Sequence, residues 1–149
     1  MADTDDLSDR VRGAVGALAE VVEEPAWVGT RWQVRGRTFA HVLGVTGAWP
    51  PAYARASGRD DAVLVMFRAT GDELEALRRQ GPPFFAPPWR RDEVGLIWSP
   101  PSDGAEVDAT ELHELLTESY CVMAPRRLAD EVRRGGLPAS PAATRSRGR

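Results

Sequence analysis

The sequence contains no lysine, and Cys121 is the single cysteine among its 149 residues. All nineteen basic residues are therefore arginines, a composition that we attribute to a GC-rich coding sequence. One cysteine cannot form a disulfide framework within the chain, and a phosphate-binding P-loop requires a Gly-Lys-Ser/Thr ending that is missing here. These absences exclude a disulfide-stabilised scaffold and phosphate-loop chemistry.

Long apolar runs are also missing, because the longest one covers only residues 62–67 and is too short to span a bilayer. The N-terminal stretch MADTDDLSDR is acidic and lacks the basic and apolar regions of a signal peptide. Together with the single cysteine, these features predict a cytoplasmic protein that has no membrane partner. We expect a monomer.

Charge is distributed unevenly along the chain, although the formal net charge is only -3. Five arginines fall in residues 133–149, which contain no acidic residue. Residues 1–132 therefore combine fourteen arginines with twenty-two acidic residues, a net charge of -8. We predict one folded domain at 1–132 and a basic, disordered tail at 133–149, whose composition is small, polar and proline-rich.

Hydrophobic periodicity and turn residues predict an alternation of helices and strands. The expected helices lie at about 6–22, 70–81, 108–123 and 125–134, and the expected strands at 31–35, 37–42, 62–69 and 94–99. Two residue pairs have the spacing that is typical of a helix start: Thr70 with Glu73, and Asp108 with Glu111. This order predicts a compact two-layer α+β domain, with a mainly antiparallel sheet of about five strands and helices packed on one face.

The segment WQVRGRTFAHV predicts a hairpin. We expect Gly36 and Arg37 to occupy the two central positions of a type II′ turn. That register would pair Val34 with Phe39 and Trp32 with His41, which would place these four apolar or aromatic side chains on one face.

Two segments contain too many turn residues for a helix or an interior strand. Residues 46–61 are predicted to form a long loop, and residues 81–93 contain four prolines and three aromatic residues. Functional groups are concentrated in such loops.

Catalytic patterns are weak, so we expect a protein that is not an enzyme and that binds no metal or cofactor. Cys121 and His113 lie eight residues apart on one predicted helix, about 12 Å along its axis, which is too far for a thiol–imidazole pair. Neither residue shows zinc-ligand spacing with His41. A buried cysteine and a hydrogen-bonded histidine beside Trp32 are the simpler interpretations.

Arginines adjacent to aromatic residues form the main functional pattern, at RWQVRGR and at WRR. Arginine binds phosphates and guanine edges, and tryptophan stacks on bases, so we expect DNA as a partner. Ordinary surface packing is the competing interpretation, and the charge of residues 1–132 disfavours sequence-independent binding. The candidate nucleic-acid contacts are Arg35, Arg37, Trp89, Arg90 and Arg91.

The aromatic loops suggest an alternative, in which a small molecule binds in a tryptophan-lined pocket. Its candidate residues are Trp32, Trp49, Tyr53, Trp89 and Trp98. The competing interpretation is that these aromatic residues belong to the core.

Four segments together resemble the MmcQ/YjbR family. They are WQVRGRTFAHV, AVLVMFRATGDELEALRRQGPPFFAPPW, VGLIW and LLTESYCVMAPRRLADEV. The last segment is the most specific, because the family has Glu-Ser-Tyr followed by Ala-Pro and a basic residue. The resemblance covers about residues 7–132.

This resemblance implies a frataxin-like (CyaY-like) antiparallel sheet, which is sometimes described as a double-wing DNA-binding motif. It also implies a link to natural-product binding or resistance, since the family is named partly after a protein of the mitomycin gene cluster. A protein-interaction module is a third interpretation. The chain departs from the family at Ala19 and Glu20, where Pro-Gly is usual, and at Arg37, where lysine is usual. Asp92 and Glu93 replace a more basic and glycine-rich turn, which weighs against phosphate contact there.

Overall fold

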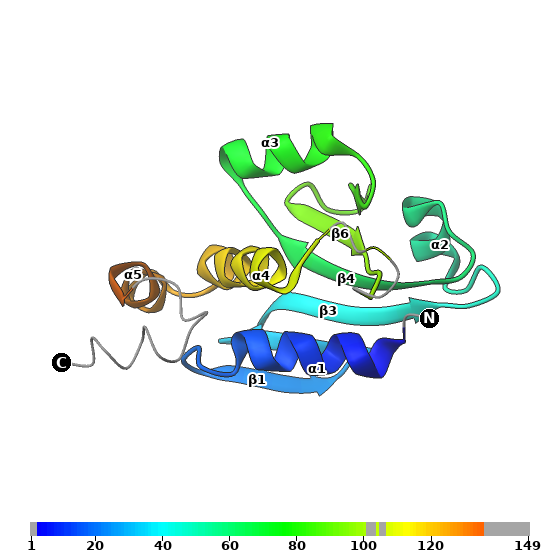
Figure 1. Ribbon diagram of the computed structural model, residues 1–149. Coiled ribbons are helices and arrows are strands. Elements are labelled where there is room, and N and C mark those ends of the chain that lie inside the picture. Colours follow the sequence, from blue (N-terminus) through cyan, green and yellow to red (C-terminus); the bar gives the residue numbers. More distant parts are fainter. Residues whose placement is uncertain (1–2, 101–103, 105–106, 136–149) are drawn as a thin grey trace.

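Six antiparallel strands form one sheet in the computed structural model, which describes residues 3–100, 104 and 107–135 (Figure 1). The spatial order is β1-β2-β3-β4-β6-β5, so β3 and β4 lie at the centre. The strands are β1 (Val21–Pro25), β2 (Thr30–Val34), β3 (Arg37–Val45), β4 (Ala62–Arg68), β5 (Phe84–Phe85) and β6 (Glu93–Ile97). The α+β class and the antiparallel sheet are confirmed, with one strand more than expected.

Five helices connect or flank these strands within the described residues. They are α1 (Thr4–Val15), α2 (Pro51–Ser57), α3 (Gly71–Gln80), α4 (Ala109–Met123) and α5 (Arg126–Gly135). Asp108 caps α4 by accepting a hydrogen bond from the Glu111 amide at 2.8 Å, as the spacing predicted. Thr70 begins α3, but its side chain forms no capping hydrogen bond.

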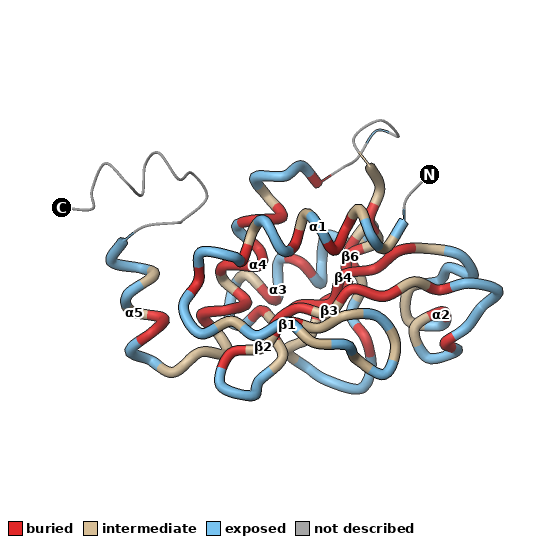
Figure 2. Tube along the Cα trace, turned by 90° about the horizontal axis from the view of Figure 1, so that it is seen from below, coloured by how far each residue is buried: buried red, intermediate tan, exposed pale blue. Residues whose placement is uncertain are grey.

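The main core lies between one face of the sheet and helices α1, α3 and α4, whose inward sides are buried in Figure 2. Leu7 and Val11 of α1 and Leu116 of α4 are fully buried there. They pack against alternate strand residues such as Val65 and Phe67. The period of two along β4 sends the intervening residues to the other side of the sheet.

The opposite face of the sheet is covered in part by α2. Leu43, Val45, Leu64 and Met66 form a second, smaller core beneath Ala54 of that helix. This second face, opposite α1 and α4, is called the open face below. Because α2 has only seven residues, it leaves one end of the open face uncovered.

The first helix is shorter than predicted, since α1 ends at Val15 rather than near residue 22. Val21 instead begins β1, an edge strand that the periodicity did not indicate. Glu20 adopts a positive φ of 63° immediately before it, which is incompatible with a continuing helix. The β-branched pair Val21 and Val22 also favours a strand.

The predicted hairpin register is wrong. Arg35 and Gly36 both have positive φ, 51° and 78°, which is the type I′ arrangement, so Val34 pairs with Arg37. A bulge between Trp32 and Gln33 then pairs Trp32 with Ala40. His41 consequently lies on the open face, away from the buried Trp32.

The predicted loop at 46–61 contains α2 and is therefore not entirely irregular. Pro51 occupies the first turn of the helix, where its missing amide hydrogen has no cost. Gly58 ends the helix in the left-handed conformation at φ 73°. The short strand β5 lies at the sheet edge, which is compatible with the prolines around it.

The predicted domain boundary at residue 132 falls within α5, which continues to Gly135. Arg133, assigned to the tail in the prediction, forms an ion pair with Glu118 of α4 at 3.3 Å. Residues 136–149, the rest of the predicted tail, lie outside the described residues.

Candidate binding site on the open face

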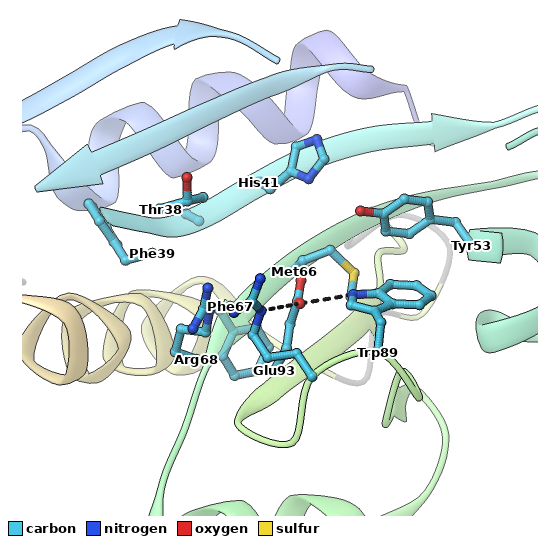
Figure 3. Close-up of a pocket in the computed structure, with 11 residues that line it drawn as sticks. Thr38, Phe39, His41, Tyr53, Met66, Phe67, Arg68, Trp89 and Glu93 are labelled. Carbon is cyan, nitrogen blue, oxygen red and sulfur yellow. Dashed lines mark hydrogen bonds and ion pairs between the residues drawn. The ribbon is translucent and has the colours of Figure 1, made fainter. Parts of the chain in front are cut away.

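A cavity of about 290 Å³ occupies the uncovered end of the open face (Figure 3). In an antiparallel sheet, the start of β3, the end of β4 and the start of β6 lie at the same end, and all three contribute to it. Tyr53 comes from α2, and Trp89 and Arg90 come from the segment before β6. The lining residues are Thr38, Phe39, Ala40, His41, Tyr53, Met66, Phe67, Arg68, Trp89, Arg90 and Glu93.

Arg68 is the last residue of β4 and places a guanidinium in this cavity. Its side chain is only 13% exposed. Nη1 donates to the two carboxylate oxygens of Asp92, at 3.2 and 3.4 Å, and lies 3.7 Å from the sulfur of Met123. The charge is thus compensated by Asp92, which does not line the cavity.

Glu93 begins β6 and is equally covered, with 13% of its side chain exposed. Its Oε1 accepts a hydrogen bond from Trp89 Nε1 at 3.0 Å and lies 3.6 Å from Nε of Arg90 (Figure 3). These contacts fix the indole of Trp89 against the cavity, even though Trp89 remains 41% exposed.

An aromatic wall closes one end of the cavity. The rings of Tyr53 and Trp89 meet edge to face, with centroids 4.9 Å apart. In Figure 3 these two rings lie toward one end of the cavity and Arg68 toward the other. The site therefore combines an aromatic end with a charged, hydrogen-bonding end.

Two titratable groups near the wall are held in their neutral forms. Burial lowers the pKa of His41, whose Nε2–H donates to the carbonyl of Val28. Burial, followed by the negative charge of Glu93, raises the pKa of the Tyr53 hydroxyl. His41 therefore presents a neutral imidazole and Tyr53 a protonated phenol.

Gly95 allows Phe85 to pack flat against the open face beside this site. A Cβ atom at Gly95 would lie 2.1 Å from Cζ of Phe85, far inside van der Waals contact. Gly95 is two residues after Glu93 on the same strand, so both face the same side of the sheet.

The arginines of the predicted nucleic-acid site have different environments. Arg35 forms an ion pair with Glu20, in which two nitrogens contact the carboxylate. Arg37 and Arg91 are exposed and form no ion pair within the described residues. Arg90 lines the cavity, as does Trp89, so the structure brings one part of the predicted set together there.

Of the five aromatic residues predicted to form a pocket, only Tyr53 and Trp89 line this cavity. Trp32 and Trp98 are buried in the main core, at 1% and 3% exposure. Trp49 packs on the surface against Trp27, with ring centroids 5.6 Å apart. The core interpretation therefore holds for Trp32 and Trp98.

Arg68, Glu93 and His41 were absent from both predicted binding sets. The continuous apolar run 62–67 does not indicate which face of the sheet Arg68 occupies, and the structure places it at the end of β4 on the open face. The sequence contains one signal for this pair. Arg68 ends one strand and Glu93 begins another, and these two strands are neighbours in the sheet.

The Glu-Ser-Tyr segment, the most specific part of the family resemblance, connects α4 to the rest of the fold. Ser119 accepts a hydrogen bond from the Arg68 amide at 2.7 Å and donates to the carbonyl of Phe39 at 2.6 Å. Its hydroxyl thus bridges β3 and β4 beneath the cavity. Tyr120 donates to the carbonyl of Ala19 at 2.8 Å, which fixes the turn before β1.

The YjbR family model matches residues 16–122, which is more than half of the chain. The chain belongs to the YjbR family. It is also similar to a crystal structure of a protein from Pseudomonas syringae, with a TM-score of 0.58 at 10% sequence identity. That match covers 82% of this chain and 99% of the other, and at this identity it supports the fold alone. A comparison with curated protein sequences gives no match.

Two kinds of feature, a membrane-spanning helix and a metal-binding cluster, are missing from the residues that the structure describes. Among these residues, no helix has the length and apolar character needed to cross a membrane. The same part of the chain contains no group of three or more His, Cys, Asp or Glu side chains arranged to hold a metal ion.

Proposed function

We propose that this YjbR-family protein binds a small molecule in the cavity on the open face, with an aromatic part of the ligand against Tyr53 and Trp89. One observation carries the proposal. Arg68 and Glu93 are cross-strand partners that both line the cavity, yet each forms its contacts with other residues. Those contacts use Nη1 of Arg68 and Oε1 of Glu93, so the remaining polar atoms of the two groups are available to a ligand.

Binding without catalysis is part of this proposal. Cys121 contacts the carbonyl of Ala129 rather than a histidine, and burial raises its pKa, which disfavours the thiolate that a nucleophile needs. The neutral forms of His41 and Tyr53 suit hydrogen bonding to a ligand. A cytoplasmic, monomeric protein agrees with this role.

The test is a panel of small aromatic compounds of different charge, namely benzoate, benzamidine, indole and nicotinamide. Binding is followed by NMR shifts of the His41 ring and by titration calorimetry. Trp89→Ala should weaken binding about tenfold or more, as for an aromatic contact at the centre of a site. Trp49→Ala is the matched control, because that tryptophan lies outside the cavity. Equal effects of the two substitutions, or no binding by any compound, would contradict the proposal.

DNA binding is the second candidate function, and one observation favours it. Three arginines lie toward the same end of the sheet, namely Arg37 at the start of β3 and Arg90 and Arg91 before β6. Exposed arginines gathered there suit contacts with phosphates. The pairing of Arg35 with Glu20 reduces the number of arginines that are available.

This second candidate is tested by fluorescence anisotropy of a labelled DNA duplex at low and near-physiological salt. The whole chain is compared with a form that ends at Gly135 and with Arg37→Ala. Binding by the shortened form that decreases with salt and with Arg37→Ala would support a DNA site on the folded domain. Binding that requires the tail, or no binding, would reject the hairpin as the contact.

A further inference from the structure

The atoms that remain available in the cavity define the ligand edge that would fit it. Arg68 uses Nη1 for Asp92, while its Nε and Nη2 have no hydrogen-bond partner within the described residues. Glu93 uses Oε1 for Trp89 and Arg90, while its Oε2 has no partner there. Two residues that line the cavity thus carry unused hydrogen-bond donors and an unused acceptor.

These donors and this acceptor lie next to each other because of the strand register. Arg68 of β4 is directly opposite Glu93 of β6, and both side chains project from the open face into the cavity. Directly opposed residues in an antiparallel pair have Cβ atoms about 5 Å apart. One flat ligand edge can therefore reach both groups at once.

Charge limits the ligand further. A simple anion would meet Arg68 and Arg90 but would also approach the carboxylate of Glu93. A simple cation would be attracted to Glu93 but repelled by the two arginines. His41 and Tyr53 are neutral and shift this balance in neither direction. A neutral ligand with its own adjacent donor and acceptor satisfies both charged groups without repulsion.

Resting on the proposed function above, we propose that the ligand is a planar heterocycle with a lactam edge, meaning a ring N–H beside a ring C=O. The carbonyl accepts from Arg68 and the N–H donates to Glu93 Oε2. The ring extends from this edge to the aromatic wall of Tyr53 and Trp89. Pyrimidine and purine lactams of the uracil and guanine type have this edge.

The experiment compares lactams with analogues in which only the N–H is lost. Uridine and guanosine are titrated calorimetrically into the full chain, beside 3-methyluridine and 1-methylguanosine. Methylation should weaken binding at least about tenfold, because it removes one hydrogen bond and leaves Oε2 of Glu93 covered and without a partner. Glu93→Gln should bind the parent nucleosides more weakly and should reduce the difference between parent and methylated forms.

Glu118→Gln is the control variant, since Glu118 of α4 pairs with Arg133 of α5 and does not line the cavity. It should leave both affinities unchanged, and thermal unfolding of each variant verifies that it is folded. Equal binding of the parent and methylated nucleosides would overturn the lactam proposal.

The outcome also separates this proposal from the function on which it depends. If the nucleosides fail to bind while compounds of the aromatic panel bind in a Trp89-dependent manner, the lactam proposal is overturned and the binding function stands. If neither set of compounds binds, both are overturned.

Discussion

Arg68 and Glu93 are directly opposed on neighbouring strands, but they form no ion pair with each other. The guanidinium of Arg68 donates to the carboxylate of Asp92. The carboxylate of Glu93 accepts from the indole of Trp89 and forms an ion pair with Arg90. Opposite charges on directly opposed strand residues ordinarily form an ion pair with each other. Here, each group pairs with other residues, and both groups line the cavity.

Asp92 should therefore affect ligand binding although it does not line the cavity. In Asp92→Ala, Arg68 loses its partner, and Glu93 remains directly opposite it on β6. We expect the two to pair and thereby to occupy the groups that a ligand uses, so that guanosine binds about tenfold more weakly. Calorimetry measures this change, and a crystal structure of the variant locates Arg68. An unchanged affinity would mean that Asp92 does not position Arg68.

Ser119 should contribute strongly to stability, because its hydroxyl serves both the amide of Arg68 and the carbonyl of Phe39. Ser119→Ala leaves both backbone groups without this partner at a fully buried position. We expect a loss of about 2–3 kcal/mol in the free energy of unfolding, measured with urea. Ser57→Ala is the control, since that hydroxyl is only partly buried at the end of α2 and should cost less than about 0.5 kcal/mol.

The two tyrosines of the chain provide a matched pair of hydroxyl deletions. Tyr120→Phe removes the hydrogen bond to Ala19 and should reduce stability by about 1 kcal/mol. Tyr53→Phe removes a hydroxyl that has no hydrogen-bond partner within the described residues, so stability should be nearly unchanged. Urea unfolding of both variants tests the difference. Equal losses would show that the contact with Ala19 does not stabilise the turn before β1.

Much of this fold follows from local patterns. The continuous apolar run 62–67 marks the central strand, and Asp108 with Glu111 marks the start of α4. Strand β1 was missed because two valines after an amphipathic helix also fit its last turn. Helix α2 was missed because it is short and starts at two consecutive prolines, although Pro51 and Gly58 are suitable terminal residues.

The site was harder to predict because it depends on register. A single bulge near Trp32 decides that His41 lies on the open face, and no pattern in the hairpin indicates that bulge. The pairing of Arg68 with Glu93 joins segments that are 25 positions apart in the sequence. Aromatic content alone does not distinguish cavity residues from core residues, because the buried Trp32 and Trp98 fit a tryptophan-lined pocket as well as Trp89 does.

Gly95 should tolerate a methyl group poorly because of Phe85. In Gly95→Ala the new Cβ would lie 2.1 Å from the ring, so Phe85 must move, at a cost of about 1–3 kcal/mol in stability. In a Phe85→Ala background the same substitution should be nearly neutral, which a double-mutant cycle measures. Gly13→Ala is the control: nothing lies within 4 Å of its added Cβ, and alanine favours α1. Additive effects at Gly95 and Phe85 would contradict this account.

Both histidines should titrate below the ordinary histidine pKa of about 6.5. Burial is the main cause for each, and Nε2 of His113 has no hydrogen-bond partner in the described structure. Because the chain has only two histidines, NMR titration of the ring protons resolves both. A measured value at or above about 6.5 for either ring would contradict its placement.

These lowered values make stability depend on pH in a defined direction. Below about pH 6.5 the unfolded chain binds protons at both histidines before the folded chain does. The free energy of unfolding should therefore fall as the pH decreases from about 6.5 toward the folded-state values. The lowered pKa values of Glu20 and Glu23, which pair with arginines, act only below the ordinary glutamate range and thus in a separate window.

The histidine contribution can be isolated with the double variant His41→Gln/His113→Gln. Urea unfolding at pH 7.5 and 5.5 should show a smaller decrease for the variant than for the natural chain, because glutamine binds no proton in this range. Glu73, whose pKa burial raises, is present in both proteins, so its contribution cancels in the comparison. Equal decreases in the two proteins would assign the pH dependence to groups other than the histidines.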